Sequence, residues 1–307
     1  VKKYECTRCD ETKTIIGHEK VSTPAKLPTM TETGNTFDER CSICGLVYVE
    51  GQVIPALNEN SFATLQGDNL IGVLDKEART LIVYGTGTIE KNHNFTATYD
   101  EDFGGNLSYS SYVDTVIIEE GVTGIGDYAF SGYPFDTYII ADSVKSIGDS
   151  AFYQSDAEKI IIGDGVETIG ANAFRNCYYL KELEIGKSVK TIGNLALFHC
   201  DDLETITVDN ENQYYSSDEY GVLFNKNKTT LIQYPIGNTR TSYTIPDSVT
   251  TIGGYAFNGC DNLTSVTIPD SVTTIGDYAF YDCDKLTSIT IGDSVTTIGN
   301  YAFYSCN

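Results

Sequence analysis

A short phrase beginning with Ile-Gly recurs seven times in this chain of 307 residues, and its spacing constrains the fold more than any other feature. Consecutive copies are separated by 22, 22, 23, 60, 23 and 23 residues. Six copies continue to Ala-Phe, and the copy at Ile192 is degenerate. The copies begin at Ile125, Ile147, Ile169, Ile192, Ile252, Ile275 and Ile298. A fixed period in this range predicts a solenoid of stacked coils.

The coil over 263–283 illustrates how one repeat buries its apolar side chains. Its first part alternates apolar residues with Thr and Ser, which predicts a short strand. We expect Gly276 to form a tight corner with a positive φ. The inward positions are Leu263, Val266, Ile268, Val272, Ile275, Ala279, Phe280 and Cys283. Since one coil cannot bury these groups alone, parallel stacking about 4.8 Å apart is predicted, with Phe257, Phe280 and Phe303 aligned in a column.

The phrase V-x-x-I-G-x-x-A-F-x-x-C, seen at Val272–Cys283 and Val295–Cys306, resembles the BspA-like branch of leucine-rich repeat proteins. The resemblance covers roughly residues 112–307. It implies a mainly β leucine-rich repeat solenoid, in which parallel strands of 22–23-residue coils form a curved sheet behind a β-rich N-terminal cap. It also implies a bacterial cell-surface or secreted protein with a role in adhesion.

The chain divides into three expected parts. Residues 1–57 form one or more small cysteine-containing modules, residues 58–111 form a β-rich lead-in that caps the first coil, and residues 112–307 form the solenoid. In the lead-in, 70–74 and 80–84 read as a hairpin. The 60-residue step contains an insertion near 209–238, which we expect to project from one coil as a hairpin around an Asn-Lys-Asn turn.

The nine cysteines fall into two sets. Cys177, Cys200, Cys260, Cys283 and Cys306 share one phase of the repeat, so we expect them to be small buried side chains. The other set is Cys6, Cys9, Cys41 and Cys44, in two C-x-x-C pairs. These four thiols could hold a structural zinc ion, although their spacing is longer than usual.

The N-terminal segment also resembles a short cysteine module of gut bacterial surface proteins, with Met30 where that module carries a cysteine. This resemblance implies an incomplete site of His18, Cys41 and Cys44. Free or disulfide-bonded thiols are the third possibility, and the favoured expectation is that no cofactor is bound.

The net charge of −23 excludes nucleic acid as a partner class, since its phosphates would be repelled. No apolar run approaches the roughly 20 residues of a membrane span, so no direct membrane insertion is expected. We expect a monomer. Because the chain begins at Val1 and ends at Asn307 within a repeat, we also expect it to belong to a longer polypeptide.

The residues that alternate with inward positions on each strand should face the open, concave side of the sheet. Three consecutive strands place an isoleucine there, and the next two place carboxylates and hydroxyls. The candidate binding residues are Ile117, Ile139, Ile161, Glu182, Glu184, Thr205 and Thr207. An exposed isoleucine stripe indicates a contact, either with an external partner or with the preceding domain. The glutamate pair is interpreted as a solvated acidic patch rather than a general acid and base.

No catalytic site is expected. The only histidines are His18, His93 and His199, and no hydrolase or metalloprotease signature occurs. His199 adjoins Cys200, but neighbouring residues point their side chains apart. Cys200 also occupies the repeat position at which the cysteines are expected to be buried. The leading hypothesis is a surface-displayed module that binds an unidentified protein or glycan. The alternatives are a structural stalk and an accessory domain of a larger surface enzyme.

Overall fold

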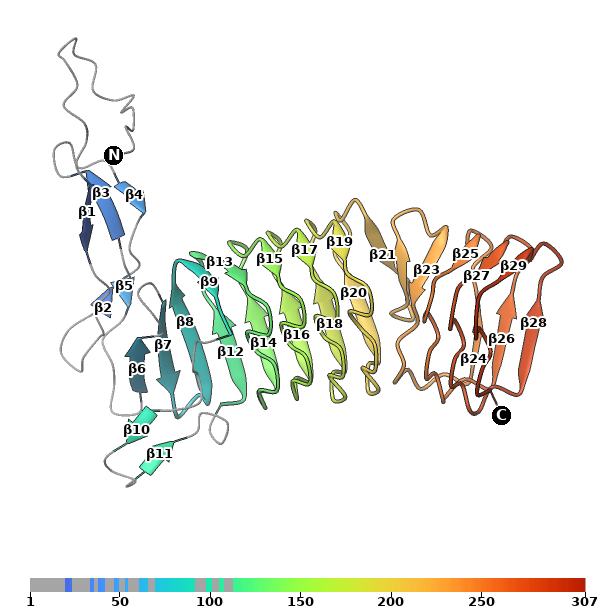
Figure 1. Ribbon diagram of the computed structural model, residues 1–307, viewed down its shortest axis with the longest axis horizontal. Coiled ribbons are helices and arrows are strands. Elements are labelled where there is room, and N and C mark those ends of the chain that lie inside the picture. Colours follow the sequence, from blue (N-terminus) through green and yellow to red (C-terminus); the bar gives the residue numbers. More distant parts are fainter. Residues whose placement is uncertain are drawn as a thin grey trace, which may run out of the picture.

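The computed structural model describes residues 70–91 and 113–306 in full, together with the backbone of strands at 20–23, 34–35, 38–41, 47–49, 53–54, 61–65, 98–100 and 105–107. Within these residues all regular secondary structure is strand. Figure 1 shows the coils stacked side by side into an elongated solenoid, along which the chain advances from its N-terminal to its C-terminal strands. The predicted β-solenoid is therefore confirmed.

The longest sheet has eight strands in the order β20-β18-β16-β14-β12-β8-β7-β6. The strands from β8 to β20 pair in parallel, and β6, β7 and β8 pair antiparallel. The bounds are β6 (Ser61–Leu65), β7 (Leu70–Asp75), β8 (Thr80–Gly85), β12 (Thr115–Ile118), β14 (Thr137–Ile140), β16 (Lys159–Ile162), β18 (Glu182–Ile185) and β20 (Thr205–Val208). The hairpin expected at 70–84 is thus present as β7 and β8, and β8 supplies the strand on which the first coil stacks.

A second sheet is made by the short strand that follows the long one in each coil. Its order is β19-β17-β15-β13-β9, and all pairings are parallel. The bounds are β9 (Gly87–Ile89), β13 (Val122–Ile125), β15 (Ser146–Ile147), β17 (Thr168–Ile169) and β19 (Thr191–Ile192). Each of these strands ends on the Ile of the Ile-Gly phrase or at its equivalent in β9, so the corner that carries Ala-Phe begins directly after it.

Both sheets stop at the insertion, and two new sheets begin, one behind the insertion and one within it. The long strands β24 (Ser242–Thr244), β26 (Ser265–Ile268) and β28 (Ser288–Ile291) form a separate parallel sheet. The other new sheet contains β21 (Tyr215–Ser217), β22 (Leu223–Asn225), β23 (Thr230–Gln233), β25 (Thr251–Ile252), β27 (Thr274–Ile275) and β29 (Thr297–Ile298).

The predicted hairpin around Asn-Lys-Asn exists as β22 and β23, but the expectation that it projects from a coil is wrong. β23 pairs in parallel with β25, with Leu231 opposite Ile252, so it takes the place of a coil strand. The physical reason is burial, because Leu223, Phe224 and Leu231 are fully buried. A projecting hairpin would leave these apolar side chains in water.

The N-terminal strands form three small antiparallel sheets. They are β1 (Lys20–Thr23) with β3 (Asp38–Cys41) and β4 (Val47–Val49), β2 (Gly34–Asn35) with β5 (Val53–Ile54), and β10 (Thr98–Asp100) with β11 (Gly105–Leu107). The side chains of all four N-terminal cysteines and of His18 lie outside the described residues. The three metal and thiol alternatives, and the bounds of the three domains, stay predictions.

The core consists of columns of equivalent apolar side chains, one from each coil, that run along the solenoid. Phe257 stacks on Phe280 at 4.7 Å between ring centroids, and Phe280 stacks on Phe303 at 5.2 Å, as predicted. The buried cysteines form another column, in which the thiol of Cys283 donates a hydrogen bond to the carbonyl of Phe257 at 3.0 Å. The columns divide into two buried clusters that meet at the insertion. Stacking therefore supplies the burial that no single coil achieves.

The glycine of the Ile-Gly phrase has a different role from the one expected. The positive-φ residues are instead the one before Ala-Phe, such as Tyr278 with φ 56°, and the one before the cysteine, such as Asp282 with φ 60°. A Cβ on Gly276 would lie 2.6 Å from the amide nitrogen of Gly254 in the preceding coil. Gly276 is thus required for close approach of two backbones, and the prediction of a positive φ was wrong.

Candidate functional site

The candidate residues lie on the solvent-facing side of the eight-stranded sheet, here called the strand face. On β12 the residues alternate, with Val116 and Ile118 buried and Thr115 and Ile117 partly exposed. The same alternation recurs on β14, β16, β18 and β20. All seven candidates thus occupy strand positions that are open to solvent, while their place on a concave side and their role in binding stay predictions.

Parallel register brings the three isoleucines together. Ile117 pairs with Ile139, and Ile139 pairs with Ile161, so their side chains form one stripe across three strands. Ile139 is 36% exposed, and its two neighbours are partly buried. The three side chains partly bury one another but leave an aliphatic band open to solvent.

Sequence reasoning missed two members of this stripe. Ile82 on β8 pairs with Ile117, and Val73 on β7 pairs with Ile82. Both side chains are partly exposed. We call the five residues Val73, Ile82, Ile117, Ile139 and Ile161 the aliphatic stripe. Both residues lie in the hairpin predicted at 70–74 and 80–84, but the lead-in lacks the repeat phrase that would have set its register against the first coil.

The stripe ends at a small charged cluster. The Nζ atom of Lys159 lies 2.8 Å from Glu182 Oε2 and 2.7 Å from Glu184 Oε1. Hydrogen bonds from the ammonium to these two carboxylates raise the pKa of Lys159 above its usual range. The glutamates therefore share one cation, and the acidic patch predicted from Glu182 and Glu184 is partly neutralised. Since both carboxylates are engaged by the ammonium, the pair is not arranged as a general acid and base.

Thr205 and Thr207 lie at the break in the sheet. Thr205 lines an open polar cleft of about 430 Å³, in which the guanidinium of Arg240 lies over the ring of Tyr220 at 3.8 Å from the centroid. The full lining is Glu204, Thr205, Glu219, Tyr220, Asn238, Thr239 and Arg240. Thr207 is exposed beside Glu184. The insertion creates this cleft, which no repeat pattern could have predicted.

Gly221 explains how the insertion approaches β20 so closely. Its carbonyl accepts a hydrogen bond from the amide of Ile206 at 3.1 Å, and its φ is 75°. A Cβ at this position would lie 2.4 Å from Thr205 Oγ1. Only glycine fits both the left-handed backbone and this contact.

The one cysteine–histidine neighbour pair shows no nucleophile geometry. Cys200 is fully buried, and its thiol donates to the carbonyl of Phe174 at 3.2 Å. Burial raises the pKa of this thiol well above its usual value. His199 Nδ1 instead lies 3.3 Å from Asp201 Oδ1. A buried thiol that stays protonated is a poor nucleophile.

In the part of the chain that the structure describes, His, Cys, Asp and Glu side chains nowhere gather in a group of three able to hold a metal ion. The same part contains no helix long and apolar enough to cross a bilayer.

Comparison with known proteins places the repeats in a family. The model of the BspA type leucine rich repeat region matches residues 102–221 and 237–307 in six copies. No curated protein matches the chain.

Solved structures share the architecture. A leucine-rich repeat protein from Eubacterium ventriosum is 30% identical, with a TM-score of 0.58 over 80% of this chain and 70% of its own. The pneumococcal vaccine antigen PcpA is 25% identical, with a TM-score of 0.55 over 80% of this chain and 74% of its own. A leucine rich cell surface protein from Faecalibacterium prausnitzii is 23% identical, with a TM-score of 0.44 over 80% of each chain.

Proposed function

Because this chain belongs to the BspA-type leucine-rich repeat family, we propose that it is a bacterial cell-surface or secreted module that binds another protein through its strand face. One observation carries this proposal. The aliphatic stripe runs across five neighbouring strands and ends at the cluster of Lys159, Glu182 and Glu184.

The chemistry of this surface favours a protein ligand. Contiguous aliphatic side chains on a soluble protein mark a contact area, because their burial against an apolar partner is favourable by roughly 25 cal/mol per Å². The adjacent Lys159 and its two glutamates add charges that fix the orientation of a partner without adding much affinity. The fixed register of the paired strands holds all of these groups in place before binding, which reduces the entropic cost of association.

A glycan is the second candidate ligand, and the polar cleft at the break supports it. Tyr220 and Arg240 form a flat stacked surface there, beside the amide of Asn238 and the carboxylate of Glu219. Flat rings flanked by amides and carboxylates offer the stacking and hydrogen-bonding groups that a sugar ring uses.

The experiment is a binding screen of the purified chain against immobilised extracellular matrix proteins and a glycan array. Each hit is repeated with Ile139→Glu and with a matched control, Thr267→Glu. Ile139 and Thr267 are both the third residue of a long strand and both exposed, but Thr267 lies beyond the break. We expect Ile139→Glu to weaken a protein hit at least about tenfold, since it places a charge within the apolar contact. The control should leave the hit unchanged.

Two outcomes would overturn the proposal. If a protein hit bound Ile139→Glu with the same affinity as the parent protein, its binding site would lie outside the strand face. Absence of any hit would favour a structural stalk, which the continuous backbone pairing of the coils also suits. Antibody labelling of intact cells of the source bacterium tests surface display, and light scattering tests the expected monomer of 33.6 kDa.

A further inference from the structure

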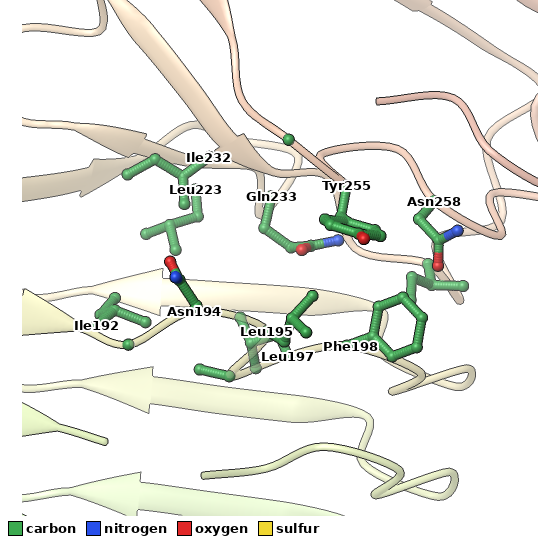
Figure 2. Close-up of a pocket in the computed structure, with 14 residues that line it drawn as sticks. Ile192, Asn194, Leu195, Leu197, Phe198, Leu223, Ile232, Gln233, Tyr255 and Asn258 are labelled. Carbon is green, nitrogen blue, oxygen red and sulfur yellow. The ribbon is translucent and has the colours of Figure 1, made fainter. Parts of the chain in front are cut away.

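A second hollow lies at the same break, between the corner of the degenerate repeat and the corner of the coil behind the insertion. We call it the corner cleft, and its volume is about 420 Å³. Figure 2 shows Ile192, Asn194, Leu195, Leu197 and Phe198 along one wall and Leu223, Ile232, Gln233, Tyr255 and Asn258 along the other. Asn194 and Gly254 are exposed at the rim, whereas Leu197, Leu223 and Ile236 are buried at the floor.

The cleft exists because the insertion shortens one corner. Leu231 pairs with Ile252, and the amide of Tyr234 donates to the carbonyl of Ala256, just as that of Phe257 donates to Ala279 in the next coil. Tyr234 therefore occupies, in the insertion, the position that Phe257 occupies in the next coil. Two residues lie between Leu231 and Tyr234, but four lie between Ile252 and Phe257. The shortened corner omits two residues, and the space they would fill stays open beside Tyr255.

This omission leaves backbone donors unpaired on one wall. At complete corners, the residue before Ala and the Phe after it donate to the next coil, as Tyr128 does to Asp149 at 3.1 Å and Phe130 to Ala151 at 2.7 Å. The equivalent amides in the degenerate repeat belong to Leu195 and Leu197. Neither amide donates a hydrogen bond to any described residue.

The opposite wall carries an unpaired acceptor. Asn258 is 2% exposed, and its Nδ2 donates to the carbonyl of Tyr281 at 3.1 Å, while its Oδ1 has no partner among the described residues. Figure 2 shows this oxygen directed towards Phe198 and the nitrogen directed away from it. A buried polar atom without a partner destabilises the folded protein, so a ligand donor that reaches it regains that free energy.

Donors on one wall, an acceptor on the other and aliphatic side chains between them match the chemistry of a peptide. A peptide group offers a carbonyl to the amides of Leu195 and Leu197 and an N–H to Asn258, and its side chain fills the apolar floor. We propose that the corner cleft binds a short segment of polypeptide that inserts one apolar side chain. This site is separate from the strand face and does not depend on the function proposed for it.

The test uses the full chain labelled with ¹⁵N and titrated with N-acetyl-L-phenylalanine amide, the smallest probe that combines an apolar side chain with peptide groups. Ethylbenzene, which has the ring but no amide, is the control ligand. We expect saturable shifts of the Leu195 and Leu197 amide resonances with the amide probe. Ethylbenzene should bind at least about tenfold more weakly, since it makes none of the hydrogen bonds.

Two variants locate the site. Leu195→Tyr should occupy the cleft and abolish the shifts, and its backbone conformation is already adopted by Tyr255 and Tyr278 with φ 61° and 56°. Asn258→Leu keeps the shape and removes the acceptor, so it should weaken the probe about tenfold. The carbonyl of Tyr281 keeps its bond from Gly259 in that variant. Unchanged far-UV circular dichroism confirms that each variant folds.

The proposal is overturned if the amide probe causes no saturable shift, or if the shifts persist in Leu195→Tyr. Equal binding of ethylbenzene would show a hollow filled by apolar contact alone, which also contradicts a peptide site. Ile139→Glu on the strand face should leave the titration unchanged, so the two proposals fail independently.

Discussion

The ring of Tyr234 stacks on the ring of Phe257, with centroids 5.2 Å apart and planes inclined by 22°. Tyr234 belongs to the insertion, and Phe257 belongs to the first regular coil behind it. This contact makes the insertion the first layer of the second half of the solenoid. It also extends the phenylalanine column to a residue outside the repeat phrase.

Replacement of Tyr234 by alanine tests this relationship. Because the side chain is fully buried, Tyr234→Ala should lower the free energy of unfolding by about 3–5 kcal/mol. Tyr234→Phe loses only the bond from its hydroxyl to Asn238 Oδ1 and should cost less than about 1 kcal/mol. Urea denaturation followed by far-UV circular dichroism measures both. Tyr214→Ala is the control, since that ring is 48% exposed, and an equal loss there would contradict the integrated insertion.

The second prediction concerns Gly276, which allows the backbones of two neighbouring coils to approach closely. Gly276→Ala should destabilise the protein by about 1–3 kcal/mol, because the new Cβ would lie 2.6 Å from a backbone nitrogen and two coils must separate. Gly254→Ala is the matched control. Its Cβ would come no nearer than 3.2 Å to Asp277 O, so the loss should be smaller. Equal melting temperatures for Gly276→Ala and the parent protein would refute the close-approach argument.

The architecture was predictable because the repeat phrase reports burial directly. The positions of Val266, Ile275 and Phe280 are apolar in each coil of the repeat because their side chains point inward. The strand face followed from the same alternation. The stripe was incomplete in the prediction, since Ile82 lies before the first repeat phrase and its register depends on pairing with β12.

The hollows were not predictable, because they arise where the period fails. A two-residue shortening between Leu231 and Tyr234 becomes visible only once backbone pairing aligns the insertion with the next coil. The acidic composition was likewise interpreted only as an argument against nucleic acid as a partner. Several carboxylates also join neighbouring coils through hydrogen bonds. Asp127 Oδ1 accepts a hydrogen bond from the backbone amide of Asp149 at 2.8 Å, and Asp149 Oδ1 accepts one from the backbone amide of Ala171 at 2.7 Å. Such pairing depends on the exact stacking of coils, which composition does not report.

The thiol column predicts selective chemical inertness. Burial raises the pKa of Cys177 and of Cys283 to about 12, so both stay protonated at neutral pH. Site-resolved mass spectrometry after iodoacetamide treatment at pH 8 should find them unmodified in the folded protein and alkylated in guanidinium chloride. Cys306 is partly exposed and should react faster than either. Rapid alkylation of Cys177 in the folded state would contradict a sealed column.

The same buried thiols should make the stability of the protein fall at high pH. An unfolded thiol ionises near pH 8.5, whereas the buried thiols retain their protons to higher pH. The native state then binds more protons than the unfolded state, so stability falls as pH rises above about 8.5. Replacement of Cys283 by alanine should reduce this loss, as measured by urea denaturation at pH 7 and pH 9.5.

At acidic pH the relevant groups are the carboxylates paired between coils. The Lys187 side chain, followed by its backbone amide, lowers the pKa of Asp164 below its ordinary value. A depressed pKa in the native state stabilises it above the unfolded pKa of about 4, and this contribution is lost as pH falls further. Lys187→Gln removes the ammonium and keeps the backbone amide, so it should lower stability at pH 7 only slightly, because the pair is exposed. As pH falls below about 4 and the carboxyl takes up a proton, the parent protein and Lys187→Gln should differ less than they do at pH 7. A difference that grows instead would show that the pair does not act through ionisation of Asp164.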